Sequence, residues 1–465
     1  MTENPTPTNE SAGRVSTSDD IEVGTYLEIA QADRVTGDNP PIAERMKTIV
    51  ILDFGSQYSR LIARRVRESN TYCEIIPHDA GNEILNEQDV IGVILSGGPN
   101  SVYADGAPMA PTWVFDAGVP ILGICYGMQL LAHQLGGKVG SGTEREYGHA
   151  VVHKDGPDNI LFRGLDTEVP VWMSHGDRIE ELPPGFRSMA YTENSPLAVM
   201  GNEEGTYFGI QFHPEVAHTP QGAEILHNFV FGVCEAPGDW TPVNFVSDAV
   251  ERIKERVGNG QVICALSGGV DSTVAAALIH RAIGDRLTCI FVDNGLMRKG
   301  EADRVQNVFA SQLGVNLIFV DGTEQFLSAL KGVTDPEIKR KSIGREFIKI
   351  FEEVAKDLGE VDYLAQGTLY PDVIESTSAD STASHKIKTH HNVGGLPEHM
   401  NLTLVEPLRY MFKDEVRQAG AELGLTPQSV NRQPFPGPGL AIRIMGEVTY
   451  EKLEILRNVD WIVID

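Results

Sequence analysis

The stretch Val119-Pro120-Ile121-Leu122-Gly123-Ile124-Cys125-Tyr126-Gly127-Met128 changes from an apolar strand pattern to a helical pattern within a few residues. Residues 119–122 predict a buried strand, and residues 128–135 predict a helix. Cys125 lies between them, and the glycines on both sides allow the backbone to bend sharply. The sequence therefore predicts a strand, a tight elbow that presents a thiol, and a helix, which together are typical of an open α/β sheet.

Strands and helices alternate on both sides of this elbow. The predicted elements are strands at 48–52, 90–95 and 261–266, and helices at 57–67 and 273–283. The second series begins after residues 237–242, where two prolines and a glycine indicate a linker. The predicted fold class is α/β, with two open, mostly parallel α/β sheet domains in tandem.

The composition limits the classes of protein to which the chain can belong. Its 465 residues suffice for several domains of ~100 to 200 residues each. A formal net charge of −27 argues against non-specific binding to nucleic acid, which is a polyanion. No apolar run approaches the ~18 residues of a membrane span, and the N-terminus lacks a signal-peptide pattern. We therefore predict a cytoplasmic protein that binds neither nucleic acid nor membranes.

Two features exclude simpler roles: an N-terminal segment without a core, and cysteines without the spacing of disulfides or zinc ligands. Residues 1–45 are rich in Ser, Thr, Asp, Glu and Pro and poor in large apolar side chains, which predicts a disordered acidic tail. The five cysteines show no paired spacing of metal ligands, so we predict neither disulfides nor structural zinc.

The first candidate site joins Cys125 to a histidine and a carboxylate. Residues 207–212 predict a strand that leads into His213-Pro214-Glu215, and two residues of an extended segment that are two apart project to the same side. Glu215 can then orient the imidazole of His213, which can serve as a base for Cys125. The helix N-terminus favours the thiolate, and the N–H of Tyr126 points toward the place where an oxyanion would form. A cysteine that only packs in the core is the alternative.

These residues resemble the class I glutamine amidotransferases over residues 46–239. The resemblance rests on Ser96-Gly97-Gly98-Pro99, on Gly123 to Gln129, and on His213-Pro214-Glu215. It implies that Cys125 attacks the side-chain amide of glutamine and that a glutamyl thioester is hydrolysed. It also implies an oxyanion hole formed by the backbone N–H groups of Gly98 and Tyr126. By the same resemblance, the glutamine pocket is lined by Gln129, Ser174 and His175.

The second candidate site is the loop Ser267-Gly268-Gly269-Val270-Asp271-Ser272, which follows a predicted strand and precedes a predicted helix. Small residues and a helix N-terminus suit phosphate, and Asp271 could hold Mg²⁺. No lysine occurs between residues 261 and 283, so this is not a Walker A loop. An ordinary glycine-rich turn is the alternative.

This loop resembles that of the ATP pyrophosphatase family, whose members cleave ATP between the α and β phosphates. The resemblance implies that a substrate is activated as an adenylate and that residues 291–295 position the adenosine. The ATP-binding residues that it implies are Ser267, Gly268, Gly269, Val270, Asp271, Ser272, Thr273 and Val292.

Three further segments resemble the family of glutamine-hydrolysing GMP synthases: residues 366–376, 387–397 and 434–440. NAD synthetase and asparagine synthetase share the loop but not this set. The resemblance implies that ATP adenylates the C2 oxygen of XMP and that ammonia then displaces AMP to give GMP. It further implies a homodimer and a synthetase domain at 240–433.

Basic residues provide candidates for binding the anionic XMP. Arg345 lies near Lys339-Arg340-Lys341 on a probable helix, and Lys386 and Lys388 lie in a glycine-flanked segment that could form a lid. A solvated basic surface is the alternative for these groups.

The C-terminal part is predicted to be incomplete. The resemblance implies a dimerisation domain that begins at residues 434–465 and is cut short in this chain, with an apolar end at 460–465 that has nothing to pack on. Three activities therefore remain open: a GMP synthase, a glutaminase whose synthetase half binds ATP without making GMP, and a non-catalytic nucleotide-binding remnant.

Overall fold

The computed structural model describes residues 46–155, 159–377, 402–433, 435 and 437–464. Within these residues one compact unit ends at Asn244 and the other begins at Phe245. The sequence-predicted domain boundary at residue 239 falls just before this division. The predicted tail at 1–45 lies outside the described residues, as do Lys386 and Lys388.

The first unit contains a nine-stranded sheet in the order β2-β1-β3-β4-β9-β8-β7-β5-β6. Its elements are β1 (Lys47–Asp53), α2 (Ser59–Glu68), β2 (Cys73–Pro77), α3 (Ile84–Glu87), β3 (Asp89–Leu95), α4 (Trp113–Asp116), β4 (Ile121–Ile124), α5 (Tyr126–Gln134), β5 (Lys138–Lys154), η1 (Ile160–Phe162), β6 (Glu168–Glu181), β7 (Phe186–Tyr191), β8 (Val199–Asn202), β9 (Tyr207–Ile210), α6 (Gly222–His227) and η2 (Asn228–Val233).

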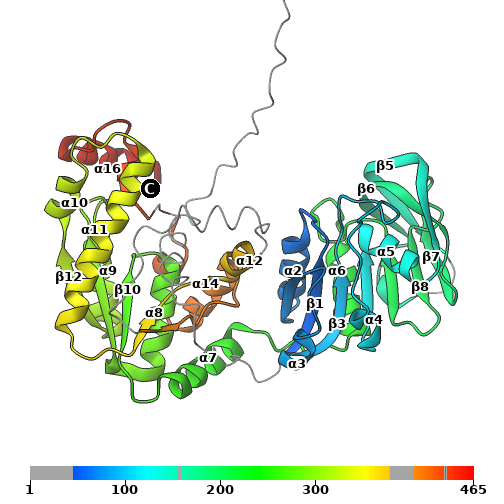
Figure 1. Ribbon diagram of the computed structural model, residues 1–465, viewed down its shortest axis with the longest axis horizontal. Coiled ribbons are helices and arrows are strands. Elements are labelled where there is room, and N and C mark those ends of the chain that lie inside the picture. Colours follow the sequence, from blue (N-terminus) through cyan, green and yellow to red (C-terminus); the bar gives the residue numbers. More distant parts are fainter. Residues whose placement is uncertain (1–45, 156–158, 378–401, 434, 436, 465) are drawn as a thin grey trace, which may run out of the picture. The chain divides into compact units, whose positions relative to one another are not determined.

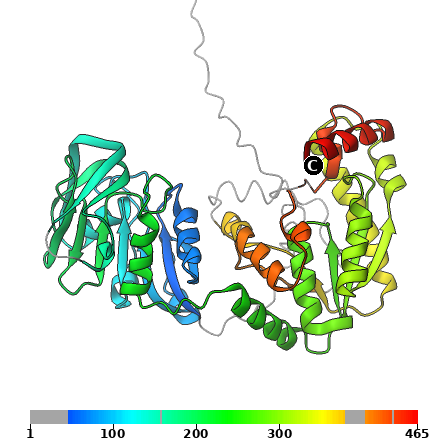
Figure 2. The same cartoon turned by 180° about the vertical axis from the view of Figure 1, so that it is seen from behind.

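This sheet has a parallel half and an antiparallel half. Strands β2, β1, β3, β4 and β9 pair in parallel, whereas β9-β8, β8-β7, β7-β5 and β5-β6 pair antiparallel. The antiparallel strands lie at the end of the sheet away from β2 (Figures 1 and 2). The predicted α/β class is confirmed, and the antiparallel half is an addition that the sequence did not predict.

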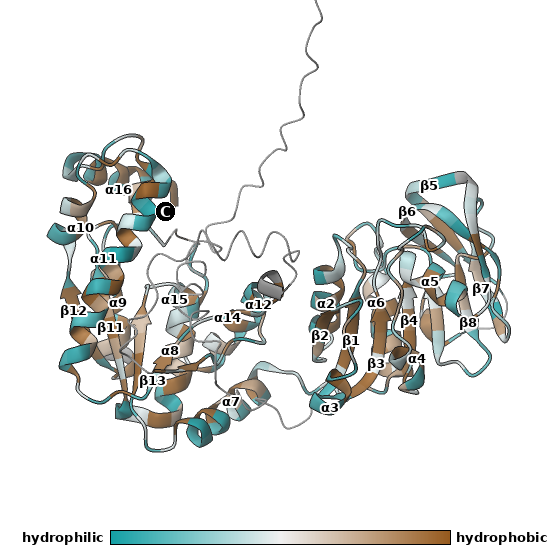
Figure 3. Ribbon diagram, viewed as in Figure 1, coloured by the Kyte–Doolittle hydropathy of each residue, from teal (hydrophilic) through white to brown (hydrophobic). Residues whose placement is uncertain are grey.

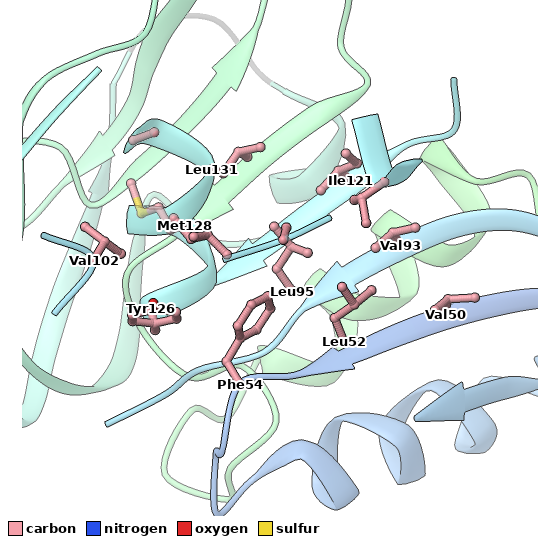
Figure 4. Packing of buried hydrophobic residues seen from close by; sticks show 14 of the residues in the cluster. Val50, Leu52, Phe54, Val93, Leu95, Val102, Ile121, Tyr126, Met128 and Leu131 are labelled. Carbon is pink, nitrogen blue, oxygen red and sulfur yellow. The ribbon is translucent and has the colours of Figure 1, made fainter. Parts of the chain in front are cut away.

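Successive side chains of β1 point to opposite faces of the sheet. Because residues 49–52 are all apolar and buried, both faces receive apolar side chains. Val50 and Leu52 join Val93 and Leu95 of β3 in a buried cluster that also includes residues of α4 and α5. Figure 4 shows Met128 and Leu131 of α5 packed in this cluster. The helix that follows the thiol is therefore fixed on the sheet by its own apolar residues.

The second unit contains a five-stranded parallel sheet in the order β12-β11-β10-β13-β14. Its elements are α7 (Pro242–Val257), β10 (Val262–Leu266), α8 (Val270–Ile283), η3 (Gly284–Arg286), β11 (Leu287–Asp293), α9 (Glu301–Gln306), η4 (Asn307–Leu313), β12 (Asn316–Asp321), α10 (Thr323–Ala329), α11 (Pro336–Asp357), β13 (Tyr363–Ala365), α12 (Tyr370–Thr377), β14 (Thr403–Val405), α14 (Lys413–Glu422), α15 (Pro427–Val430), η5 (Gly439–Arg443) and α16 (Tyr450–Ile464).

Helices cover both faces of this sheet (Figure 1). On one face, residues of α10, α11, η5 and α16 pack with Ile263, Ile290 and Val292 in one buried cluster. On the other face lie α8 and α14. Figure 3 shows apolar residues concentrated in the central strands of both sheets. None of the helices within the described residues combines the length and apolar character that a membrane span requires.

The C-terminal helix only partly matches the prediction of an apolar end with nothing to pack on. Leu453 and Asp460 of α16 are buried, and Leu453 belongs to the same cluster as the strands. Trp461, Ile462 and Val463 are more than half exposed, at 51%, 76% and 77%. One face of α16 is therefore part of the core of the second unit, whereas its last turn is largely exposed.

Candidate active sites

The elbow at Cys125 has the predicted strand-to-helix geometry. β4 ends at Ile124, α5 begins at Tyr126, and Cys125 between them has φ 52° and ψ −104°. A non-glycine residue with such a positive φ stores strain of about 1–3 kcal/mol, which is characteristic of functional turns. The Cys125 N–H donates to the carbonyl of Ile210 at 2.8 Å, which ties the elbow to the end of β9.

The two glycines beside the cysteine are required by close packing. A Cβ on Gly123 would lie 2.4 Å from the carbonyl oxygen of Gly127, and a Cβ on Gly127 would lie 2.2 Å from that of Leu95. Neither distance is compatible with a side chain. These glycines therefore let α5 begin directly against β3 and β4, which places the thiol at the carboxyl end of the parallel strands.

His213 and Glu215 complete a buried triad with Cys125. His213 Nδ1 lies 2.8 Å from Glu215 Oε1, and the imidazole also hydrogen-bonds to Cys125. Burial by itself lowers the pKa of His213, but the bonds to Cys125 and Glu215 outweigh it and raise that pKa to about 10. At neutral pH the imidazole is thus protonated and faces the sulfur.

Neighbouring groups fix the orientation of the imidazole. The Tyr58 ring lies edge-on to it, at 5.2 Å between ring centroids. The His213 backbone N–H donates to the Trp172 carbonyl at 3.1 Å, and Thr219 Oγ1 donates to the His213 carbonyl at 2.7 Å. Within the described residues, Glu215 Oε2 is buried without a hydrogen-bond partner. Glu215 therefore uses one of its two carboxylate oxygens, Oε1, to orient the imidazole.

Gly98, one of the two predicted oxyanion donors, lies against the side chain of the other, Tyr126. A Cβ on Gly98 would lie 3.2 Å from Cγ of Tyr126 and 2.9 Å from the carbonyl oxygen of Phe54. A Cβ on the preceding Gly97 would lie 3.2 Å from Cε1 of His213 and 3.9 Å from Cβ of Cys125. The backbone at Gly97 therefore lies directly against His213 and Cys125, and a side chain on Gly97 would crowd the imidazole.

The predicted glutamine-pocket residues also lie at the triad. Sγ of Cys125 lies 3.7 Å from the carbonyl oxygen of Ser174. Gln129 Nε2 donates to the carbonyl of Asp177 at 2.9 Å and to Oε1 of Gln211 at 3.2 Å. Gln211 in turn reaches the sulfur with its Nε2, at 3.8 Å. Gln211 was missed by the sequence analysis because glutamine in a buried strand has no distinctive local pattern.

The side chain of His175 belongs to a buried network. Its Nε2 lies 3.1 Å from Glu146 Oε2, and its Nδ1 lies 2.9 Å from the Asp177 carbonyl. Thr192 Oγ1 donates to Glu146, at 2.9 Å to Oε1. Burial raises the pKa of Glu146, but the bonds from His175 and Thr192 outweigh it and leave that pKa lowered. The role predicted for His175 in binding glutamine stays a prediction, and its ring supports the strand that carries Ser174.

The second site begins where β10 ends. The strand order places β10 between β11 and β13, so the loop after β10 lies at the point where the chain changes direction across the sheet. Gly268 has φ +77°, Ser267 Oγ accepts from the N–H of Gly269 at 3.1 Å, and Thr273 Oγ1 donates to the Gly269 carbonyl at 2.7 Å. We call residues 267–273 the phosphate loop.

Some of the predicted ATP-binding residues have side chains that are buried or bonded to other protein groups. The hydroxyl groups of Ser267 and Ser272 form a hydrogen bond with each other, with 3.1 Å between their oxygens. Val270 and Val292 are buried, at 5% and 1% exposure, and Val292 belongs to the core cluster of the sheet. Any contact of these two valines with ATP would therefore come from their backbone.

Two distant cations reach the phosphate loop, and sequence reasoning missed both. Lys413, the first residue of α14, places Nζ 2.5 Å from Asp271 Oδ2. Arg432 contacts both the Gly268 carbonyl and the buried carboxylate of Glu301. These contacts span 142 and 164 residues of sequence, so no local motif could reveal them.

The basic residues predicted to bind XMP are only partly available. Arg345 is exposed, and its Nε donates to the Lys341 carbonyl of its own helix at 3.4 Å. Lys339 is fully buried and donates to the carbonyls of Ala441 and Ile444, at 3.2 Å and 2.6 Å. Burial and nearby Lys452 lower the pKa of Lys339. The alternative of a solvated basic surface is wrong for Lys339, because it is buried and donates to these carbonyls.

The carboxylates at the phosphate loop are compatible with a magnesium ion that is held mainly by phosphate. Among the described residues no group of three or more His, Cys, Asp or Glu side chains could enclose a metal by itself. Mg²⁺ in nucleotide sites uses only one or two carboxylates together with phosphate oxygens and water. Asp271, at the start of α8, fits such a role.

Comparisons with known proteins match both units. The family "Glutamine amidotransferase class-I" matches residues 50–233, and the family "NAD synthase" matches residues 242–346. A protein of Dehalococcoides mccartyi is 61% identical over 417 residues, covering 90% of this chain and 78% of the relative. Proteins of Heliobacterium modesticaldum and Thermomicrobium roseum are 54% and 55% identical and cover 91% and 92% of this chain, and 82% and 81% of their own lengths. All three are named "GMP synthase [glutamine-hydrolyzing]".

Proposed function

Because the chain belongs to the family of glutamine-hydrolysing GMP synthases, we propose that its two units divide one reaction between them. The enzyme is a carbon–nitrogen ligase that hydrolyses glutamine and uses ATP to aminate XMP to GMP. The first unit releases ammonia, and the second unit activates XMP with ATP and consumes the ammonia. Both units carry the groups that their half-reactions need.

In the first half-reaction, the Cys125 thiolate attacks the side-chain carbonyl carbon of glutamine. The N–H groups of Gly98 and Tyr126 stabilise the oxyanion that forms. His213, which is protonated because its pKa is raised to about 10, gives its proton to the leaving nitrogen, and ammonia departs. Water then attacks the thioester and gives a proton to His213, so that glutamate leaves and the ion pair is restored. Glu215 holds the imidazole throughout.

In the second half-reaction, the C2 oxygen of XMP attacks the α-phosphorus of ATP, and pyrophosphate leaves. Ammonia then attacks C2 and AMP leaves, which yields GMP. The phosphate loop would hold the β and γ phosphates through its backbone N–H groups and the N-terminus of α8. Lys413 and Arg432 lie where they can exchange their present partners for phosphate oxygens. Mg²⁺, held by Asp271 and the phosphates, would supply counter-charge.

Several finer features belong to the same proposal. We assign XMP contacts to Arg345, Lys386 and Lys388, of which only Arg345 lies in the described residues. We further propose a cytoplasmic enzyme that forms a homodimer. It would bind neither nucleic acid nor membranes, as its net charge of −27 indicates.

The observation that supports the proposal best is the buried Cys125–His213–Glu215 triad on the same chain as the phosphate loop. The test is an assay with XMP, ATP-Mg²⁺ and glutamine in which GMP, AMP and glutamate are each quantified. Equal amounts of GMP, AMP and glutamate are expected. Formation of glutamate without GMP would show that the protein is a glutaminase and not a ligase.

Two controls make this assay decisive. Omission of XMP should stop the formation of AMP, because XMP is the nucleophile for ATP. A Cys125→Ala variant should make no GMP from glutamine and should still make GMP from ammonium at the wild-type rate. Loss of both activities in this variant would contradict the proposed division between the units.

A further inference from the structure

The loop between β11 and α9, residues 294–300, lies beside the phosphate loop. The resemblance assigns the adenosine to the first residues of this nucleotide loop. Glu301, directly after it, places Oε1 3.1 Å from where a Cβ on Gly268 would lie. The loop starts with two tight turns, in which the N–H groups of Gly295 and Leu296 donate to Asp293 Oδ1 and Asn294 Oδ1, each at 2.9 Å.

One arginine of the C-terminal helix holds the middle of the nucleotide loop. Arg457 of α16 donates from Nη2 to the carbonyl of Gly295 at 2.6 Å and from Nε to the carbonyl of Met297 at 3.0 Å. Its side chain is 19% exposed, and Nη1 pairs with Glu454 on the solvent side. A single planar guanidinium therefore fixes two carbonyls of a loop that lies 160 residues away in sequence.

An acidic residue one turn further along α16 holds the end of the same loop. Asp460, whose side chain is 7% exposed, lies 3.0 Å from Arg298 Nε and 2.8 Å from Arg443 Nη1. Both guanidinium groups lie over the ring of Phe435, at 4.6 Å and 5.9 Å. The carboxylate and the ring together determine where Arg298 sits.

Gly439 and Leu440, at the end of the segment 434–440 that carries part of the resemblance, contribute a further contact. The N–H of Leu440 donates to the carbonyl of Leu296 at 2.8 Å. Gly439 before it has φ +67°, and a Cβ there would lie 2.6 Å from the same carbonyl oxygen. Gly439 and Leu440 thus pack directly on the nucleotide loop, which gives these two residues of the motif a physical role that the two half-reactions do not use.

We propose that α16 is part of the ATP site and that Arg457 is a positioning residue, which holds the nucleotide loop in the conformation that receives the adenosine. This rests on the proposed function, because it takes the loop to be the adenosine contact. Without the guanidinium, the carbonyls of Gly295 and Met297 lose their donors and the loop samples other conformations. Only the competent conformation of the loop binds ATP, so the apparent affinity for ATP falls in proportion to the population of that conformation.

The test compares Arg457→Met with Glu454→Gln in the full chain. Glu454→Gln removes the charged partner of Arg457 but keeps the bonds from the guanidinium to the loop. For Arg457→Met we expect a KM for ATP raised by about tenfold, since two charge-assisted hydrogen bonds are lost. The KM for XMP should stay unchanged and kcat should stay within about twofold. Glu454→Gln should match the wild type, and Arg457→Lys should recover part of the ATP affinity.

Calorimetric binding of ATP-Mg²⁺, without XMP or glutamine, separates this inference from the proposed function. Tighter binding by the wild type than by Arg457→Met supports the positioning role, whether or not GMP is made. Equal affinities would overturn that role while leaving the proposed function intact, as would a lower kcat with an unchanged KM for ATP, which would indicate only a less stable fold. A wild-type chain that binds no ATP would overturn the synthetase assignment and this inference together.

Discussion

The cysteine site and the phosphate loop balance their charges in different ways. At the cysteine site, the protonated His213 lies between the sulfur and Glu215, so the charges that catalysis needs are already paired with each other. At the phosphate loop, Lys413 and Arg432 are paired with protein groups that a triphosphate would replace. Under the proposed function, the first site is preorganised for its reaction, whereas the second would exchange ion-pair partners when ATP binds.

This difference predicts different responses to substitution. A preorganised triad fails when one member loses its orientation, because no other group can restore the geometry. A site that exchanges partners should lose affinity for ATP without losing its fold. Each substitution below tests whether the two sites are as separate as this comparison implies.

Glu215→Gln should have the largest effect. The amide can present its NH₂ group to Nδ1 of His213 and so stabilise the wrong tautomer, which lowers triad activity by about 10³- to 10⁴-fold in comparable cases. We expect a loss of this size in glutamine-dependent GMP formation and none in ammonium-dependent formation. The matched control is Glu224→Gln, at an exposed position on α6. A parallel loss of the ammonium-dependent rate would show that the sites are not independent.

Lys413→Met should have the next largest effect. Removal of a cation that would stabilise the charge developing at phosphate costs about 100-fold in comparable sites. We therefore expect a loss of that order in ammonium-dependent AMP formation, with glutaminase activity unchanged. Lys349→Met is the control, because this exposed lysine pairs weakly with Glu346, at 3.9 Å. An unchanged rate would mean that Lys413 serves only to neutralise Asp271.

The elbow could be predicted from the sequence because its causes are local. An apolar strand, two glycines and a helical pattern follow one another within residues 119–135, and the observed β4 and α5 lie in the same place. His213 and Glu215 could be predicted because they follow β9 closely, although β9 ends at Ile210 and not at the predicted residue 212. Pro214 and Glu215 form a turn and not the predicted extended segment. In each case, a few adjacent residues determine the direction of the chain.

The remaining features depend on contacts that are distant in sequence. The 17-residue β5 mixes polar residues and glycines, so its pairing with β6 is determined by the partner strand rather than by its own pattern. The sequence around Lys339 is compatible with a basic surface, but the carbonyls of Ala441 and Ile444 accept hydrogen bonds from Lys339 inside the core. The role of Arg457 could not be predicted from the sequence, because its acceptors are backbone atoms 160 or more residues away.

Glu146→Gln should have a moderate effect that is confined to the cysteine site. The change weakens the bond from His175 that supports the strand of Ser174 and Asp177. Loss of one charge-assisted hydrogen bond predicts a KM for glutamine raised by about tenfold, with little change in kcat. The control is Glu168→Gln, whose side chain is 70% exposed. A change in kcat alone would place the network in the chemical step rather than in substrate binding.

The smallest effect concerns stability rather than rate. Burial opposes protonation of His213, but its bonds to Cys125 and Glu215 raise its pKa in the folded protein to about 10, above the ordinary value of 6.5. The folded state thus binds this proton more tightly than the unfolded chain, so the stabilisation is fully present below pH 6.5 and is lost as the pH rises through about 10. The Tm difference between the wild type and His213→Gln should therefore shrink by a few degrees across this range. His133→Gln, at an exposed position on α5, provides the baseline. A Tm difference that stays constant from pH 6 to 10 would mean that the triad does not hold the proton in the folded state, and the contrast between a preorganised and an exchanging site would lose its electrostatic basis.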